Sequence, residues 1–329
     1  MYSKKLQVKN IELSTRVVLG PMAGITTLAY REFMKPFGVG LSFSEMISDC
    51  GIDYNNQRTY EYLATSNKDH PVGLQLFGFK KENTVNAISI IERKADYDIL
   101  DINLGCPVTK VVKTGAGSAW LKDLDRLKEY MQAVCASSSK PVSAKIRLGW
   151  DEENINVFQV SKLLEEAGVS FLTVHCRTRS QGYSGEADYD AIAGLKETLS
   201  IPLCVSGDIF SLDKAKEALA KTKADCVMVA RGAVGNPFLI TQIAHYLETG
   251  ESLPDPSVVQ QAEWAKEFAN MLIDLKGEFT AIKELRGIIP KFFSGFPGYK
   301  KVRNEIAMNT YSKERLFAVL EGVQKRERC

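Results

Sequence analysis

Residues 97–109 read YDILDINLGCPVT, an apolar run that opens into a turn carrying a glycine and a proline. The run has the length and composition of a buried strand, and the turn presents Asn103 and Cys106 where that strand ends. A cysteine at the end of a buried strand is a candidate catalytic group when other polar residues gather around it. The fold decides which residues those are.

Seven further apolar runs repeat this pattern, and amphipathic segments such as 153–168 and 212–224 lie between most of them. Eight strands that alternate with helices over about 240 residues match the size of a (β/α)8 TIM barrel, an α/β fold. A doubly wound open sheet is the alternative, but the turn GPMAG at 20–24 lacks the G-x-G-x-x-G fingerprint of its dinucleotide site. We expect the eight strands at 17–22, 39–46, 71–77, 97–103, 141–148, 170–176, 201–207 and 225–232.

The composition of the 329-residue chain is that of a globular protein, with 45% hydrophobic and 25% charged residues and a net charge of +2. No apolar run approaches the length of about 20 residues that a membrane span needs, and the first ten residues lack the apolar segment of a secretory signal. We therefore expect a cytoplasmic protein with no membrane partner. The seven cysteines include no C-x-x-C pair, which argues against a disulfide framework and against a metal site.

Polar residues stand at the ends of the expected strands, where a barrel places its active site. The last two strands end in SGD at 206–208 and ARG at 230–232, and these two ends of a barrel commonly bind a phosphate through backbone N–H groups. The preceding strands end in Pro21, Met22 and Ala23, in Ser44 and Glu45, in Gln75, in Asp101, Asn103 and Cys106, in Lys145 and Arg147, and in His175, Arg177 and Arg179.

A phosphate site, a lysine on the fifth strand and a glutamine on the third suit flavin mononucleotide (FMN), because a cation beside the flavin stabilises the negative charge of its reduced ring. Lys145 is the candidate cation, although a strand-end lysine that reaches solvent fits the sequence equally well. His175 is either a site residue or a core histidine. Gln75 lies in the apolar run LQLF, where a buried amide needs partners, and we expect a ligand to supply them.

The residues after 245 depart from the barrel pattern. Proline and glycine at 245–257 indicate a linker, and the segments beyond it show helical periodicity. We expect a catalytic barrel domain over 1–245 and a helical domain over 246–329. From residue 281 onward there are eleven lysines and arginines against five glutamates. This excess suits the phosphate backbone of a nucleic acid, and a solvated helix face gives the same composition.

Nine motifs, taken in order, resemble the tRNA-dihydrouridine synthase family, most closely its bacterial B type. They are PMAGIT, SEMIS, LQLFG, DINLGCP, KTGAGSAWL, KIRLGW, HCRTRSQGYSGEADYD, SGDI and VMVARGA, and they span nearly the whole chain. The resemblance implies an FMN barrel with a helical tail that binds tRNA, and reduction of the 5,6 double bond of uridine to dihydrouridine. It also implies NADPH or NADH as the reductant of the flavin.

The resemblance further implies roles for single residues. Cys106 matches the acid that protonates one carbon of the uracil double bond while reduced flavin gives hydride to the other. An ordinary thiol pKa of about 8.5 suits that role, because the thiol is then protonated at neutral pH. Asn103 and Arg177 match positions that contact flavin or uracil. The positions expected to bind FMN are Pro21, Met22, Ala23, Gln75, Lys145, His175, Ser206, Gly207, Asp208, Ala230, Arg231 and Gly232.

The chain departs from the family pattern in three places. Ser206 stands where the family usually has asparagine, and Cys176 where it usually has glycine. The arginine-lysine-histidine signature of the tail is reduced to ELRGIIPKFF at 284–293. Two other functions stay open at this point. One is an FMN barrel oxidoreductase that acts on a free pyrimidine or another small molecule, and the other is a noncatalytic RNA-binding flavoprotein.

Overall fold

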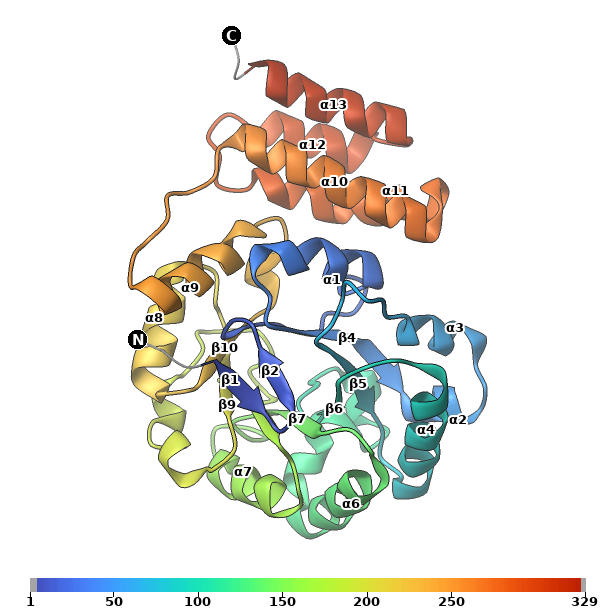
Figure 1. Ribbon diagram of the computed structural model, residues 1–329, viewed down its shortest axis with the longest axis vertical. Coiled ribbons are helices and arrows are strands. Elements are labelled where there is room, and N and C mark those ends of the chain that lie inside the picture. The colour runs from blue at the N-terminus through green and yellow to red at the C-terminus, as the bar shows by residue number, and fades with distance from the viewer. Residues whose placement is uncertain (1–4, 327–329) are drawn as a thin grey trace.

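In the computed structural model, which describes residues 5–326, eight parallel strands close into a barrel with helices around it (Figure 1). The strands follow one another in chain order, and β10 closes the barrel by pairing with β3. Each strand overlaps one of the eight expected runs, so the predicted barrel is confirmed. The strands are β3 (Val17–Leu19), β4 (Leu41–Ser48), β5 (Val72–Phe77), β6 (Ile99–Asn103), β7 (Val142–Arg147), β8 (Phe171–His175), β9 (Leu203–Ser206) and β10 (Cys226–Val229).

The barrel strands are apolar along their length because both of their faces are covered. All five residues of β6 are buried, and they alternate between two environments. Leu100 and Ile102 belong to the core between strands and helices, whereas Ile99 packs inside the barrel with residues such as Phe43 and Phe171. The inward face of the same strand carries Asp101 beyond Ile99, toward the end of the strand where the site lies.

A short antiparallel hairpin, which was not predicted, covers the amino-terminal end of the barrel. It consists of β1 (Leu6–Val8) and β2 (Ile11–Leu13). Figure 1 shows the hairpin lying across the barrel strands. Leu13 is fully buried and belongs, with the inward barrel residues Phe43 and Met228, to one apolar cluster. The hairpin therefore closes the end of the barrel opposite the strand termini that carry the polar residues.

Helices join most of the barrel strands. The expected helices at 153–168 and 212–224 are found as α7 (Val157–Glu166) and α8 (Leu212–Thr222), and Ser211 starts the latter by accepting a hydrogen bond from the Lys214 N–H. Two 3-10 helices, Asp190–Ile192 and Lys196–Thr198, take the place of a helix between β8 and β9. The other helices of the barrel are α1 (Leu28–Met34), α2 (Asp49–Asp53), α3 (Gln57–Tyr60), α4 (Lys81–Lys94), α5 (Thr109–Val112), α6 (Leu124–Ser137) and α9 (Phe238–Thr249).

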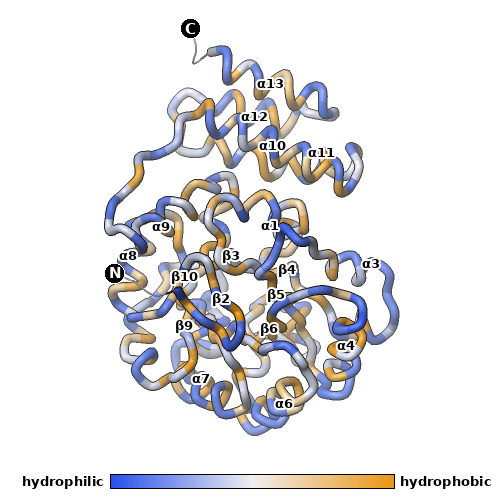
Figure 2. The backbone as a smooth tube through the Cα atoms, in the orientation of Figure 1, coloured by the Kyte–Doolittle hydropathy of each residue, from blue (hydrophilic) through white to orange (hydrophobic). Residues whose placement is uncertain are grey.

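Four helices follow the barrel and stack beside α1 and α9 (Figure 1). Helix α9 continues to Thr249, past the expected boundary at 245, and an irregular segment at 251–257 leads to the helical region. Hydrophobic and hydrophilic positions alternate along these helices, as amphipathic helices require (Figure 2). The helices are α10 (Val258–Lys276), α11 (Glu278–Ile288), α12 (Lys300–Asn309) and α13 (Lys313–Arg326), and the 3-10 helix Ile289–Phe293 follows α11.

The helical region shares its core with the barrel. The ring of Phe33 in α1 lies 5.4 Å from that of Phe268 in α10 and 6.3 Å from that of Phe292. The Tyr30 hydroxyl, also from α1, donates a hydrogen bond to the Ala233 carbonyl at the end of the barrel. One continuous apolar cluster therefore includes residues of both parts.

Candidate active site

A cavity of about 440 Å3 lies at the carboxyl ends of the barrel strands. A smaller hollow of about 90 Å3 adjoins it, because Pro21, Met22, Lys145, His175 and Arg231 line both. Together the two spaces are lined by fourteen of the fifteen residues that the sequence placed in the site. The cavity adds Ala23, Gln75, Asn103 and Cys106 to the shared residues, and the hollow adds Ser206, Gly207, Asp208, Ala230 and Gly232.

A row of hydrogen bonds runs along one wall of the cavity. The register of the barrel pairs Gln75 with Asp101, and the Gln75 amide donates to the Asp101 carboxylate at 2.6 Å. The Gln75 carbonyl accepts from the Asn103 amide at 2.8 Å, and Ser143 donates to the other Asp101 oxygen at 2.6 Å. Protein groups therefore supply partners for the Gln75 amide, and the expected contact of Gln75 with a ligand stays a prediction.

Burial raises the pKa of Asp101 to about 6, although the hydrogen bonds from Gln75 and Ser143 act in the opposite direction. A carboxylate that accepts these two bonds fixes the orientation of the Gln75 amide. That amide in turn fixes the amide of Asn103.

The Cys106 turn is held by its backbone. The Asn103 side-chain oxygen accepts hydrogen bonds from the N–H groups of Gly105, at 3.2 Å, and Cys106, at 2.8 Å. The Cys106 carbonyl accepts from the Ser118 N–H at 3.1 Å. A side chain at Gly117 would approach the same carbonyl to 2.8 Å, so only glycine allows this close contact. The row that begins at Asp101 therefore ends by placing the thiol at the cavity wall.

The Cys106 side chain is a neutral thiol. The residue is 6% exposed, and burial raises its pKa above the ordinary value even though the Val108 N–H and the charges of Arg147 and Lys145 lower it. A thiol in this state gives up a proton only when a basic atom is brought to it. It is therefore suited to act as an acid and unsuited to act as a thiolate nucleophile.

Lys145 and His175 line the same cavity as the thiol. Burial, followed by the nearby charge of Arg147, lowers the pKa of Lys145 to about 8. Burial and the charges of Lys145 and Arg147 lower the pKa of His175 well below its ordinary value, so its imidazole is neutral. Among the described residues, the buried Nε2 atom of His175 has no hydrogen-bond partner. A ligand with a polar atom at this point would supply one.

The hollow beside the cavity is made by two turns that pack against each other. The turn after β9 contains Gly207, with φ 125°, and Asp208, with φ 50°. A side chain at Gly232, after β10, would lie 2.0 Å from the Ile209 carbonyl. These residues keep the backbone close to the hollow, as binding of an anion to backbone groups requires.

Arg177 lies outside both spaces. It is buried, and its guanidinium donates to the Asp208 carboxylate and to the carbonyls of Ser184 and Gly185. Burial alone would raise the pKa of Asp208, but the hydrogen bonds from Arg177 and the Ala187 N–H lower it on balance. The expected contact of Arg177 with flavin or uracil is therefore replaced by a structural role, because the ion pair ties the loop after β8 to the turn after β9.

Other residues line the cavity that were given no role from the sequence, and three of them carry polar groups. Arg147, which the sequence placed at the end of its strand, is buried and donates to the carbonyls of Gly105 and Gly182, each at 2.8 Å. Tyr183 is 58% exposed, and its ring lies 5.5 Å from the Arg147 guanidinium and 4.7 Å from that of Arg231. Lys291 comes from the helical region. The alternation in KIRLGW, which puts residues 145 and 147 on one face, is the signal that could have assigned Arg147 to the site together with Lys145.

The fold and this cavity are those of a (β/α)8-barrel enzyme, whose active site lies at the carboxyl ends of the strands. Comparison of sequences gives the family. The model of the dihydrouridine synthase (Dus) family matches residues 18–327, and the chain belongs to this family of oxidoreductases.

Relatives of similar length carry the same family name. A probable tRNA-dihydrouridine synthase of Rickettsia conorii is 36% identical over 301 residues, which cover 92% of this chain and 91% of that protein. The tRNA-dihydrouridine synthase B of Pasteurella multocida is 35% identical over 318 residues, covering 96% of this chain and 95% of the relative. The expected resemblance to the B type is thereby confirmed.

Solved structures with the same fold are more distant in sequence. An old yellow enzyme homologue from Zymomonas mobilis has a TM-score of 0.54 and 12% identity, over 79% of this chain and 96% of that one. A histamine dehydrogenase from Rhizobium sp. 4-9 has a TM-score of 0.57 and 12% identity, over 82% of this chain and 51% of that one. At this identity the likeness concerns the barrel fold alone.

Two further observations concern ligands and surroundings. Between residues 5 and 326, no group of three or more histidine, cysteine, aspartate or glutamate side chains is arranged to hold a metal ion. No helix in that same part of the chain is long and apolar enough to cross a membrane.

Proposed function

We propose that the protein is an FMN-dependent tRNA-dihydrouridine synthase that takes its electrons from NADPH or NADH. The observation that carries the proposal is the convergence of a neutral Cys106 thiol, the Lys145 ammonium and an unpartnered His175 nitrogen on one cavity at the mouth of the barrel. The family and the names of its relatives support the substrate class. A cytoplasmic location stays a prediction.

The residues present fit FMN. The hollow formed by Gly207 and Gly232 suits the phosphate, the neutral His175 imidazole has an unpartnered nitrogen for a polar atom of the ring, and Lys145 supplies a cation beside it. FMN, when bound, supplies hydride chemistry. The protein then needs a proton donor on the substrate side. Cys106 is that donor, because its thiol is protonated and its turn is fixed by Asn103.

The helical region offers cations for the phosphates of tRNA. Lys291, at the cavity wall, and Lys300 and Lys301, at the start of α12, are exposed, and no described carboxylate pairs with them. Other basic residues serve the fold: Arg303 donates to the Phe293 carbonyl, and Arg315 pairs with Glu305. The side chains of Arg326 and Arg328, counted in the basic tail, lie outside the described residues.

The aromatic residues interleaved with these cations are part of the core. Phe292 and Phe293 are buried, and the ring of Phe293 stacks on that of Tyr299 at 6.1 Å. We therefore expect this face to bind tRNA through its charges, and the affinity for tRNA to fall steeply as the salt concentration rises.

The test is the exchange of Cys106 for alanine in the flavin-loaded protein. We expect Cys106→Ala to keep its flavin absorbance and to be reduced by NADPH, while its reduction of tRNA uridine falls by about 10²- to 10⁴-fold, the usual contribution of a positioned acid. Cys135→Ala, which changes a cysteine of α6 remote from the cavity, is the control. Reduction of tRNA by Cys106→Ala at the rate of Cys135→Ala would refute the assignment of the acid.

The same assay separates the alternatives. A flavin-loaded wild-type protein that reduces free uracil and leaves tRNA uridine unchanged is a small-molecule oxidoreductase. One that binds tRNA and oxidises no NADPH in its presence is a noncatalytic RNA-binding flavoprotein.

A further inference from the structure

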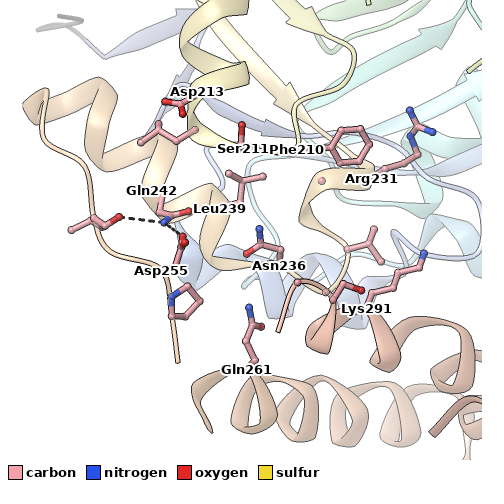
Figure 3. A pocket seen from close by; sticks show the side chains of 18 of the residues that line it. Phe210, Ser211, Asp213, Arg231, Asn236, Leu239, Gln242, Asp255, Gln261 and Lys291 are labelled. Carbon is pink, nitrogen blue, oxygen red and sulfur yellow. Dashed lines mark hydrogen bonds between the residues drawn. The ribbon is translucent and has the colours of Figure 1, made fainter. Parts of the chain in front are cut away.

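A further cavity, of about 770 Å3, lies between the barrel and the helical region (Figure 3). Its walls come from the turns after β9 and β10, from α9, from the segment 252–256 and from α10. Its volume falls in the range of about 300–1,000 Å3 that is usual for ligand sites. It shares Arg231, Val234 and Lys291 with the catalytic cavity, so the two spaces adjoin at these side chains.

The polar groups of this interdomain cleft differ between its two ends. Figure 3 shows Arg231 and Lys291 at one end, beside the catalytic cavity, and Gln242 with Asp255 at the other. Gln242 is fixed there, because its amide donates to the Asp255 carboxylate at 2.9 Å. A ligand that follows the cleft therefore meets two cations first and, farther in, a group of amides, the Asp255 carboxylate and the ion pair of Asp213 with Lys216.

The amide of Gln261 in α10 lacks a partner. The residue is 3% exposed and lines the cleft, and among the described residues its buried Oε1 atom accepts no hydrogen bond. Figure 3 shows this side chain pointing from α10 toward Asn236, whose own amide also faces the cleft. A buried acceptor without a partner costs free energy, and a ligand that brings an N–H donor removes that cost.

We propose that this interdomain cleft binds the adenosine half of the nicotinamide dinucleotide that reduces the flavin. The pyrophosphate lies between Arg231 and Lys291, and the nicotinamide extends into the catalytic cavity. The adenine lies among Asn236, Gln242 and Gln261. A carboxamide matches the donor and acceptor edge of adenine, and the exocyclic amine of adenine supplies the donor that the Gln261 oxygen lacks.

The charges of the cleft favour a dinucleotide over a strand of RNA. A dinucleotide carries its pyrophosphate in one place, next to the two cations. An RNA strand carries a phosphate at every nucleotide, and a strand laid along the cleft would bring a phosphate to the Asp255 carboxylate, which pairs with no cation among the described residues. The inference rests on the proposed function, because it assigns a site to the reductant of that reaction.

The experiment measures flavin reduction without tRNA, by anaerobic stopped-flow absorbance of the flavin-loaded protein. Two reductants are compared: NADH, whose only phosphates are those of the pyrophosphate, and reduced nicotinamide mononucleotide, which lacks the adenosine half. Wild-type protein should have a lower Kd for NADH than for the mononucleotide, and Gln261→Ala should reduce the ratio of the two Kd values by about tenfold, as loss of one base-specific amide contact predicts. Gln260→Ala, which changes the exposed neighbouring amide of α10, should keep the wild-type ratio.

The Kd for tRNA is determined for the same variants. Retention of the wild-type Kd ratio by Gln261→Ala overturns the proposal. So does a weakening of tRNA binding that equals or exceeds the weakening of NADH binding, since the cleft would then bind RNA or hold the two parts together. Reduction of tRNA uridine by dithionite-reduced wild-type protein tests the proposed function separately, because that step needs no dinucleotide.

Discussion

Cys106 combines a fixed backbone with a protonated thiol. Its N–H is bonded to Asn103, which is fixed through Gln75 by Asp101, so the sulfur is held in place by residues of two strands. Because the turn is already rigid, it does not have to reorganise when the substrate binds.

The pH dependence of uridine reduction follows from the state of this thiol. Burial raises the pKa of Cys106, so its protonated form, the acid, persists as the pH rises. We expect the single-turnover rate constant of prereduced protein with tRNA to be level from about pH 6.0 to about pH 7.5, because the thiol and the Lys145 ammonium both keep their protons there. A rate that declines steadily between pH 6.0 and 7.5 would contradict a raised pKa of Cys106.

Folding lowers the pKa of Lys145 to about 8, below its ordinary value of 10.5, whereas it raises the pKa of Cys106. The folded protein then binds fewer protons than the unfolded chain between these values, so the stability tied to Lys145 is present at high pH and lost as the pH falls through 8. We expect Lys145→Met in the flavin-free protein to raise the free energy of unfolding by about 1–3 kcal/mol at pH 7, with less gain at pH 9.5.

Urea unfolding at the two pH values measures this gain. Lys128→Met, on the exposed face of α6, is the matched control and should show no such pH dependence. A gain for Lys145→Met that is equal at both pH values would show that the lysine is not desolvated.

Sequence reasoning found Cys106, Lys145 and His175 because strand ends converge in a barrel and these residues follow buried runs. It misplaced Arg177, because the partners of that side chain come from Ser184, Gly185 and Asp208, in loops whose packing leaves no periodic signal. The partners of Gln75 were missed for a different reason. Asp101 and Gln75 lie on neighbouring strands, and the register that pairs them depends on the closed barrel.

At the scale of elements, the eight strands were predictable because each is an apolar run bounded by turn residues. The hairpin of β1 and β2 was not, because each strand has three residues and its stability comes from the barrel beneath it. The region between β8 and β9 likewise shows no helical period, and it forms 3-10 turns.

A substitution in the hairpin tests whether the amino-terminal end of the barrel affects flavin binding at the opposite end. Leu13 is fully buried against the inner barrel residues, so Leu13→Ala should lower the free energy of unfolding by about 2–5 kcal/mol. Flavin affinity should stay within twofold of wild type, because the site lies at the opposite end. Leu275→Ala, at a leucine that is 43% exposed, is the control for denaturant unfolding and flavin titration. Loss of flavin from Leu13→Ala under native conditions would mean that the hairpin also shapes the site.

At the scale of the whole molecule, the barrel and the helical region are joined by packing as well as by the linker. Linker composition predicted two domains, yet Phe33, Phe268 and Phe292 form one aromatic contact across the boundary. The sequence could not show this, because the three residues are far apart in the chain and each fits the core of its own helix. The interdomain cleft exists only while this contact holds the two parts together.

At Gly235 the barrel backbone lies close to the backbone of the helical region, and exchange of this residue tests whether their contact matters for function. A side chain at Gly235 would lie 2.4 Å from the Lys291 carbonyl carbon and 2.6 Å from the Phe292 nitrogen, whereas one at Gly298 would meet no atom within 4 Å. Both glycines have positive φ, 78° and 83°, so alanine costs about 1–2 kcal/mol of backbone strain at either position. Only Gly235→Ala adds a clash that separates the barrel from the helical region.

We therefore expect Gly235→Ala to accelerate proteolysis in the segment 251–257 and to lower tRNA reduction by at least about tenfold, since a displacement of about 1 Å at a site can cost 10²-fold in rate. Gly298→Ala should lose stability through backbone strain, but its proteolysis and its tRNA reduction should stay at the wild-type rates. Equal proteolysis and equal activity in the two variants would mean that the helical region acts through its charge alone, with its position over the barrel left free.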